Sequence, residues 1–137
     1  MVGILIIAHD NLGDSLIRCA THVLNKEPQG VRQLGVGMHD DPAVALRQAQ
    51  QAVAELDDGD GVLVLSDIYG ATPSNIAMKL MVPGRVEGVA GVSLPMLVRS
   101  LTYRDRGIAV MVQKAVSGGH DGVVHINRDV CRSAAAG

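Results

Sequence analysis

The sequence predicts an α/β domain in which helices cover both faces of a parallel β-sheet. Three continuous apolar runs indicate strands that are buried on both faces, at Val2 to Ala8, Gly61 to Leu65 and Val86 to Val92. Segments whose apolar residues recur at helical spacing lie between these runs. Strands that alternate with helices favour parallel pairing, because each return of the chain to the sheet then crosses over through a helix.

The first half of the chain supplies two strand–helix units. After the first apolar run, Leu12 to Leu24 predicts a helix with one apolar face. Val31 to Val36 is less apolar and predicts an outer strand. The next helix is expected to begin at Asp41 and Pro42, because aspartate caps helices and proline suits the first helical position. It ends before the acidic turn that begins at Asp57.

The second half supplies two further helices around the third and fourth strands. Thr72 is expected to cap a third helix with Pro73 in its first turn, and a Val-Pro-Gly sequence at residues 82–84 ends this helix. A Ser-Leu-Pro sequence at residues 93–95 begins a fourth helix, which continues through Leu101.

The C-terminal part predicts a fifth helix and a short final strand. The helical pattern runs from Ile108 to Val116, and Gly118-Gly119 is expected to end it. Val123 to Ile126 then predicts a strand. We expect a single domain at residues 1–130, followed by a frayed tail at residues 131–137.

The order of the strands determines where a functional crevice lies. Right-handed crossovers leave few orders open. We expect the flavodoxin-like, doubly wound order 2-1-3-4, in which strand 1 lies beside strand 3. The crevice of such a sheet lies between the carboxyl ends of these two strands.

The composition argues against several classes of function. The 137 residues are 47% apolar and 19% charged, with a formal net charge of −2 and no basic patch of the kind that nucleic acid requires. Neither Trp nor Phe is present for base stacking. The apolar runs are too short for a membrane span and no signal peptide is visible, so a cytoplasmic location is expected. No spacing of His, Cys and carboxylates predicts a metal, and no cofactor is expected.

A histidine ends the first strand at the edge where the crevice is expected. His9 lies at the carboxyl end of strand 1 and Asp67 at that of strand 3, so the two meet if these strands are neighbours. A carboxylate that accepts a hydrogen bond from one ring nitrogen leaves the other nitrogen with its lone pair. His9 and Asp67 are therefore the predicted catalytic residues, with His9 as a base or a nucleophile.

The tight turn after Asp67 predicts an anion-binding loop. Gly70 and Ala71 lead into a helix whose free N–H groups and positive end attract anions. Thr72 and Ser74 add hydroxyl donors. An oriented imidazole beside such a loop suits phosphoryl transfer through a phosphohistidine. From these residues alone, a phosphate-related site and a hydrolytic site both remain open.

Three segments together resemble the mannose-type IIA component of the bacterial sugar phosphotransferase system (PTS). They are GILIIAHDNLGDSLIRCA at residues 3–20, GVLVLSDIYGATPSNIA at residues 61–77 and VEGVAGVSLPMLVRSL at residues 86–101. The resemblance extends over Val2 to Ile126. Three motifs in this order and spacing are far more specific than His9 alone.

The resemblance implies a phosphocarrier. The strand-1 histidine of the family, which His9 matches, accepts a phosphoryl group from the phosphocarrier protein HPr and passes it to a IIB partner. The family carries this group on the ring nitrogen remote from its aspartate, which Asp67 matches. The loop pattern of the family is matched here by Gly70, Thr72, Pro73 and Asn75.

The resemblance also implies a homodimer. Members of the family typically exchange a C-terminal strand, and Val123 to Ile126 fits such a strand. A separate IIB protein is expected, and contact with a membrane sugar permease is expected to be peripheral at most. Ala8 and Asp10 depart from the family, which often has Thr or Ser before the histidine and Gly after it. Asp10 places a second carboxylate beside the nucleophile, which bears on phosphohistidine stability and on partner choice.

Three alternatives accompany the leading interpretation of a phosphocarrier for sugar uptake. The first is a regulatory phosphoprotein whose output is phosphorylation-dependent binding of another protein. The second is the phosphoryl donor subunit of a dihydroxyacetone kinase. The third is a hydrolase in which His9 and Asp67 serve Thr72 as nucleophile, which is disfavoured because no Gly-x-Ser-x-Gly elbow is present.

Overall fold

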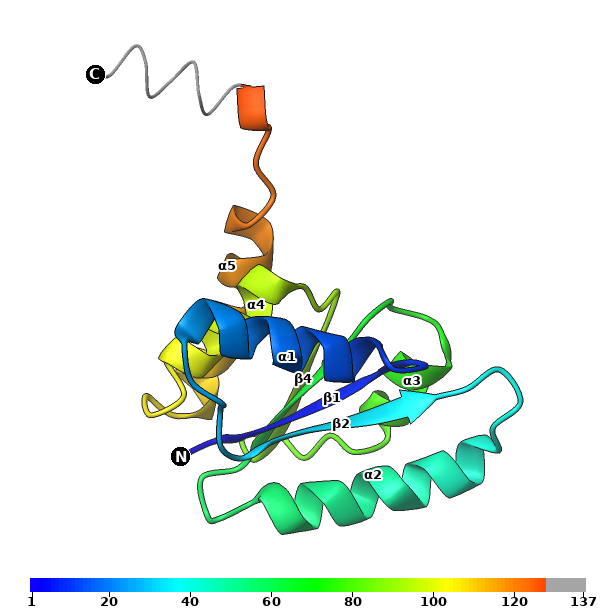
Figure 1. Ribbon diagram of the computed structural model, residues 1–137. Helices are drawn as coiled ribbons and strands as arrows, with labels where there is room; N and C mark the ends of the chain where they lie inside the picture. Colours follow the sequence, from blue (N-terminus) through cyan, green and yellow to red (C-terminus); the bar gives the residue numbers. More distant parts are fainter. Residues whose placement is uncertain (128–137) are drawn as a thin grey trace.

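A four-stranded parallel sheet forms the centre of the computed structural model, which describes residues 1–127 (Figure 1). The strands are β1 (Gly3–His9), β2 (Val31–Val36), β3 (Val62–Ser66) and β4 (Val86–Ala90). Their order is β2-β1-β3-β4, and each neighbouring pair is parallel. The predicted fold class and strand order are confirmed.

The helices assigned within residues 1–127 cover both faces of this sheet. They are α1 (Leu12–Leu24), α2 (Pro42–Leu56), α3 (Thr72–Met78), α4 (Leu94–Thr102) and α5 (Ile108–Asp121). Figure 1 shows α1 and α2 on opposite faces. One core lies between the sheet and α1, α4 and α5, and the other lies between the sheet and α2 and α3.

β1 supplies side chains to both cores. Ile4, Ile6 and Ala8 belong to the core under α1, α4 and α5. Leu5 and Ile7 belong to the core under α2 and α3. None of these five side chains is more than 1% exposed. Burial on both faces explains why the apolar run is continuous rather than alternating.

α2 and α4 begin as the sequence predicts. The Asp41 carboxylate accepts a hydrogen bond from the Ala43 N–H at 2.9 Å. The Ser93 hydroxyl accepts one from the Met96 N–H at 3.3 Å. Each bond satisfies one of the free N–H groups of a first helical turn.

α3 begins and ends differently from the prediction. Ala71 is the N-cap, without a side-chain capping bond, and Thr72 is the first helical residue. The prediction that Thr72 caps this helix is therefore wrong. The helix also ends at Met78 rather than at residues 82–84, because the chain turns early into a short bridge between Val82 and Val86.

α5 continues through Gly118 and Gly119 to Asp121, so the predicted end at these glycines is wrong. A Cβ atom on Gly118 would lie 2.9 Å from the Arg99 Cβ of α4. The missing side chain therefore allows the two helices to approach closely, and tertiary packing outweighs the low helix propensity of glycine.

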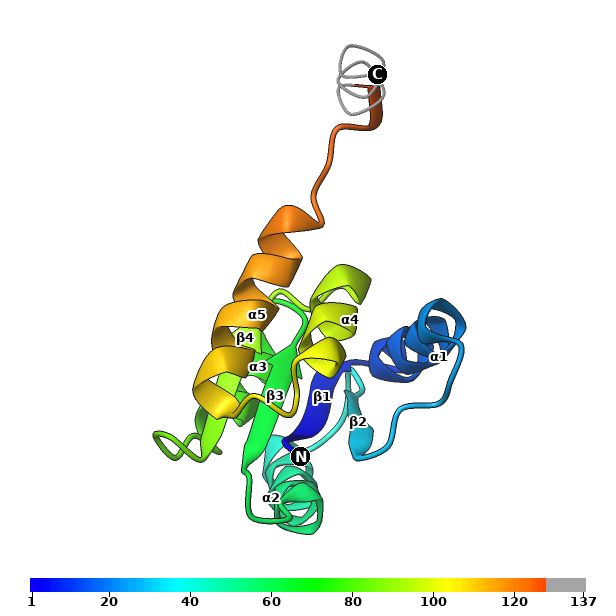
Figure 2. The same cartoon turned by 90° about the vertical axis from the view of Figure 1, so that its left-hand side faces the viewer.

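The segment from Val123 to Ile126 pairs with none of the four strands within the described chain, and its exchange as a strand between two copies stays a prediction. Figure 2 shows this segment leading away from the domain beyond α5. Val123 is 85% exposed and Ile126 is 76% exposed. The predicted tail at residues 131–137 lies outside the described residues.

Arg104 joins the end of α4 to the starts of two strands. Its side chain donates hydrogen bonds to the backbone carbonyls of Val2, Gln29 and Gly30. The residue is 7% exposed, and burial lowers the pKa of its guanidinium.

Arg104→Met is expected to lower the free energy of unfolding by about 2–4 kcal/mol, because three carbonyls lose a buried charged donor. Urea denaturation measures the change. Arg106→Met is the control, since Arg106 is exposed and its loss is expected to cost no more than about 0.5 kcal/mol. Equal midpoints for both variants would contradict the role of Arg104.

Candidate functional site

His9 and Asp67 lie together at the carboxyl edge of the sheet. β1 and β3 are parallel neighbours, with Ile7 opposite Ser66. His9 is the last residue of β1, and Asp67 directly follows β3. The predicted pairing is therefore present, because strand register brings the two residues to the same point.

Two hydrogen bonds hold His9 against one carboxylate oxygen. Asp67 Oδ2 accepts the backbone N–H of His9 at 2.9 Å and lies 2.7 Å from the ring Nδ1. In the neutral ring this contact makes Nδ1 the donor and leaves Nε2 with its lone pair. The His9 side chain is 50% exposed and that of Asp67 13%. The ring is therefore open to solvent while the carboxylate that orients it is mostly covered.

The pKa of Asp67 is lowered from 3.8 by its hydrogen bonds. Burial of the carboxyl raises this pKa, but the backbone N–H of His9, the His9 ring and the Ile68 N–H together outweigh the burial. The Ile68 N–H donates to Oδ1 at 2.8 Å. Asp67 is therefore ionised at neutral pH and stabilises positive charge on the ring.

Ser74 has a different place from the one predicted. It is 3% exposed, and its hydroxyl accepts the Gly70 N–H at 2.8 Å and donates to the Ala71 carbonyl at 3.0 Å. The Gly70 N–H and the Ser74 hydroxyl, both predicted as donors to a ligand, bond to each other in this structure. Among residues 1–127, the N–H groups of Ala71 and Thr72 donate no hydrogen bond.

Asp10 turns the chain sharply after His9. Its φ of 50° lies in the left-handed region that favours glycine. Its N–H donates to the Val36 carbonyl at 3.0 Å. A Cβ atom on Gly35 would lie 1.9 Å from the Asp10 carbonyl oxygen, so glycine is required in β2 beside this turn. Gly35 is not among the residues predicted for the site, although a glycine inside a predicted strand is a signal of close backbone approach.

Apolar side chains are exposed on the segments that follow β1, β2 and β3. The set comprises Leu12, Met38, Ile68 and Tyr69. Met38 is 91% exposed and Tyr69 is 75% exposed. These segments leave the same edge of the sheet as His9, because parallel strands end together. Exposed apolar residues gathered at one edge are typical of a protein-binding surface.

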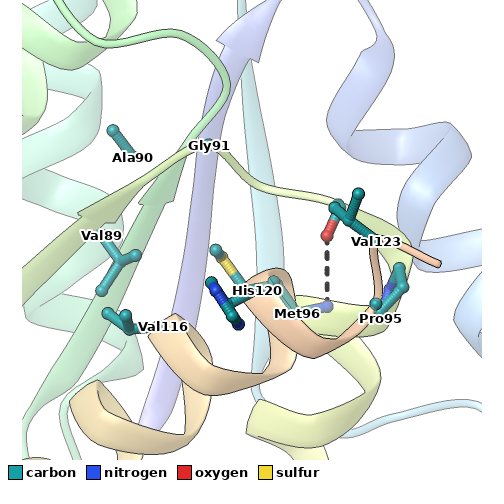
Figure 3. Close-up of a pocket in the computed structure, with 11 residues that line it drawn as sticks. Val89, Ala90, Gly91, Pro95, Met96, Val116, His120 and Val123 are labelled. Atoms are coloured by element: carbon teal, nitrogen blue, oxygen red, sulfur yellow. Dashed lines mark hydrogen bonds between the residues drawn. The ribbon is translucent and has the colours of Figure 1, made fainter. Parts of the chain in front are cut away.

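A cavity of about 390 Å³ lies away from His9, where β4 ends, α4 begins and α5 ends (Figure 3). Its walls include Val89, Pro95, Met96 and Val116, and His120 and Val123 line it from the end of α5 and the segment beyond. Figure 3 shows the Met96 N–H bonded to the Ser93 hydroxyl at its edge. The cavity lies at the carboxyl end of the outer strand β4, and His9 is not among the residues that line it.

Within residues 1–127, no helix combines the length and the apolar character that a membrane span needs. In the same residues, no three His, Cys, Asp or Glu side chains gather closely enough to hold a metal ion.

Two solved structures of similar fold are described as IIA proteins of the phosphotransferase system. The phosphotransferase system component EIIA from Streptococcus agalactiae superposes with a TM-score of 0.82 at 22% identity, covering 93% of this chain and 99% of that one. The PTS IIA protein associated with the fucose utilization operon of Streptococcus pneumoniae gives a TM-score of 0.81 at 23% identity, covering 95% of this chain and 99% of that one. At these identities the likeness establishes the fold.

Sequence comparison identifies the family. The mannose-specific EIIAB component of the PTS from Escherichia coli (strain K12) is 30% identical over 125 residues, which are 89% of this chain. The chain spans 38% of the length of that relative. The family model described as PTS system fructose IIA component matches residues 3–116. With most of its length matched, the chain belongs to this IIA family of the phosphotransferase system, the mannose-type family that its motifs resemble.

Proposed function

We propose that this IIA protein is a histidine phosphocarrier that takes a phosphoryl group from phospho-HPr and gives it to a separate IIB protein. The 2.7 Å contact between His9 Nδ1 and Asp67 Oδ2 is the observation that carries the proposal. It presents Nε2 as the nucleophile. The Nε2 lone pair forms the new bond to phosphorus, and the bond between phosphorus and the donor atom breaks with its electron pair staying on the donor.

Asp67 assists the transfer in both directions. The ring becomes positively charged as Nε2 bonds to phosphorus, and the ionised carboxylate at Nδ1 stabilises that charge. When the phosphoryl group then leaves Nε2 for the acceptor, the same contact keeps the ring in place. Because the His9 ring is already oriented, less entropy is lost when Nε2, the phosphoryl group and the partner protein are aligned for transfer.

Thr72 and Ala71 are the groups that we assign to the phosphoryl oxygens. Thr72 is exposed, so its hydroxyl is accessible. The N–H groups of Ala71 and Thr72 have no hydrogen-bond acceptor among residues 1–127. α3 packs against β1 and thereby holds this loop near the end of the strand that carries His9. Thr72 forms no hydrogen bond with His9 within the described residues, which disfavours the hydrolase alternative.

Intact mass spectrometry tests the proposal. The purified protein is mixed with phosphoenolpyruvate, enzyme I and HPr at neutral to mildly alkaline pH. A gain of one phosphoryl group that is lost on acid treatment is expected, because phosphohistidine is acid-labile. If a control IIA protein is labelled in the same mixture and this protein is not, the proposal is wrong.

The exposed apolar set Leu12, Met38, Ile68 and Tyr69 supports docking of protein partners around His9. HPr and IIB are the partners that we propose for this surface, in the cytoplasm. Transfer of label from the phosphorylated protein to a IIB protein is expected for sugar transport. Transfer of label to a dihydroxyacetone kinase subunit would instead favour the alternative of a phosphoryl donor for that kinase. Binding of another protein without transfer of label would favour the regulatory phosphoprotein.

We further propose that two copies exchange the segment Val123 to Ile126 as a strand. Support comes from the outer position of β4, whose free edge is paired in the described chain only by the bridge between Val82 and Val86, and from the exposed apolar residues of the segment. Analytical ultracentrifugation is expected to find a dimer for a chain ending at residue 127 and a monomer for one ending at residue 121. Dimers of equal stability for both chains would contradict strand exchange.

A further inference from the structure

Ser74 is the side chain that closes the loop between β3 and α3. Besides the Asp67 contacts, the loop from Ile68 to Ala71 is tied down by the Gly70 N–H bond to Ser74 Oγ at 2.8 Å and the Ser74 Oγ bond to the Ala71 carbonyl at 3.0 Å. Ile68, Tyr69 and Gly70 are otherwise exposed. Ser74 is 3% exposed as a residue, and both of its hydrogen bonds are partly buried. Such bonds fix geometry firmly, because leaving either partner unsatisfied is costly.

The bond to the Ala71 carbonyl also sets the direction of the next N–H group. This carbonyl accepts the Asn75 N–H at 3.0 Å in addition to the Ser74 hydroxyl, so it points into α3. In a planar trans peptide the C=O and N–H groups point in opposite directions. The Thr72 N–H belongs to the same peptide and therefore points out of α3, toward the carboxyl edge of the sheet where His9 lies.

α3 has only seven residues, so the field of so short a helix does not by itself make an anion site. The orientation of individual peptides then decides how well the loop meets a phosphoryl group carried by His9. Gly70 cannot supply a donor, because its N–H is bonded to Ser74. The N–H groups of Ala71 and Thr72 are left to do so, and Ser74 acts on the peptide that carries the Thr72 N–H.

We propose that Ser74 is a positioning residue for phosphoryl transfer, which acts by orienting the Thr72 peptide toward the phosphoryl group on His9. This inference rests on the proposed phosphocarrier function. Ser74 itself touches neither His9 nor the phosphoryl group, since both of its bonds stay inside the loop. It therefore tunes the rate of transfer rather than the docking of partners.

Three variants separate the hydrogen bonds of Ser74 from its packing. Ser74→Ala removes the hydroxyl, Ser74→Cys keeps nearly the same shape but hydrogen-bonds weakly, and Ser74→Thr keeps the hydroxyl. We expect kcat for phosphorylation by phospho-HPr to fall about 10-fold in the Ala and Cys variants, as for a misplaced transition-state contact. KM for phospho-HPr is expected to be unchanged, and Ser74→Thr is expected to restore most of the rate.

NMR of the Thr72 amide provides a readout that loss of stability does not mimic. In the wild-type protein this amide is expected to shift when His9 is phosphorylated, and in folded Ser74→Cys the shift is expected to be reduced. An unchanged kcat and an unchanged Thr72 shift in Ser74→Cys, alongside normal wild-type phosphorylation, would overturn the inference. A wild-type protein that takes up no phosphoryl group would instead overturn the proposed function on which the inference rests.

Discussion

His9→Gln is expected to abolish uptake of the phosphoryl group from phospho-HPr, because the amide side chain has no lone pair of comparable nucleophilicity to replace Nε2. The loss is expected to exceed about 10³-fold, the scale on which removal of an activated nucleophile acts. Intact mass spectrometry of the variant in the complete donor mixture measures it. Folding is expected to be retained, since the His9 side chain is half exposed at the end of a strand.

His39→Gln is the matched control for this experiment. His39 is also an exposed histidine, on the loop that follows the neighbouring strand β2. It lacks a carboxylate contact of the kind that His9 has with Asp67 in the described structure. Full labelling of His39→Gln with none of His9→Gln is the expected pattern. A labelled His9→Gln protein would place the phosphoryl group elsewhere and refute the proposal.

The main architecture followed from the sequence because two physical signals are strong and local. Burial on both faces forces a continuous apolar run, and β1 shows this at Ile4 to Ile7, where every residue is fully buried. Parallel crossovers then limit the strand order. His9 and Asp67 meet because β1 and β3 are parallel neighbours and each residue lies at the carboxyl end of its strand.

The errors occurred where tertiary contacts outweigh local preference. Gly118 predicts the end of a helix by itself, yet it lies inside α5 because Arg99 of α4 packs against it. The hydrogen bonds of the Ser74 hydroxyl to Gly70 and Ala71 are likewise a property of the folded loop. Neither contact can be predicted from the order of residues alone, because each depends on the folded conformation of the chain.

The backbone conformation at Asp10 explains why the family often has glycine at this position. Position 10 has a φ of 50°, so a glycine there is free of strain, whereas aspartate tolerates the left-handed region at a modest cost. The hydrogen bond from the Asp10 N–H to the Val36 carbonyl holds this turn against β2. The family's glycine thus has a physical reason, and the Asp10 carboxylate is an addition of this chain at the exposed edge beside His9.

Asp67→Asn is expected to slow phosphoryl uptake by about 100-fold or more, by analogy with the loss of a carboxylate that orients a catalytic histidine. Asp67 accepts three hydrogen bonds, two at Oδ2 from His9 and one at Oδ1 from the Ile68 N–H. Asparagine offers one carbonyl oxygen and one NH₂ group. If its oxygen faces His9, the NH₂ group meets the Ile68 N–H and the charge that stabilises the ring is lost. If its NH₂ group faces His9, Nδ1 must become the acceptor and Nε2 loses its lone pair.

The same variant tests the lowered pKa of Asp67 through the pH dependence of stability. Since this pKa is lowered from 3.8 in the folded protein, the ionised carboxylate stabilises the fold above that value. The stabilisation disappears as the pH falls through the folded-state pKa. The wild type is therefore expected to be more stable than Asp67→Asn in urea at neutral pH, and the difference is expected to shrink well below 3.8. Asp14→Asn, on the exposed first turn of α1, is the control. A gap that stays constant with pH would show that the Asn variant loses packing rather than a stabilising charge, and the account of His9 orientation by an ionised Asp67 would then be wrong.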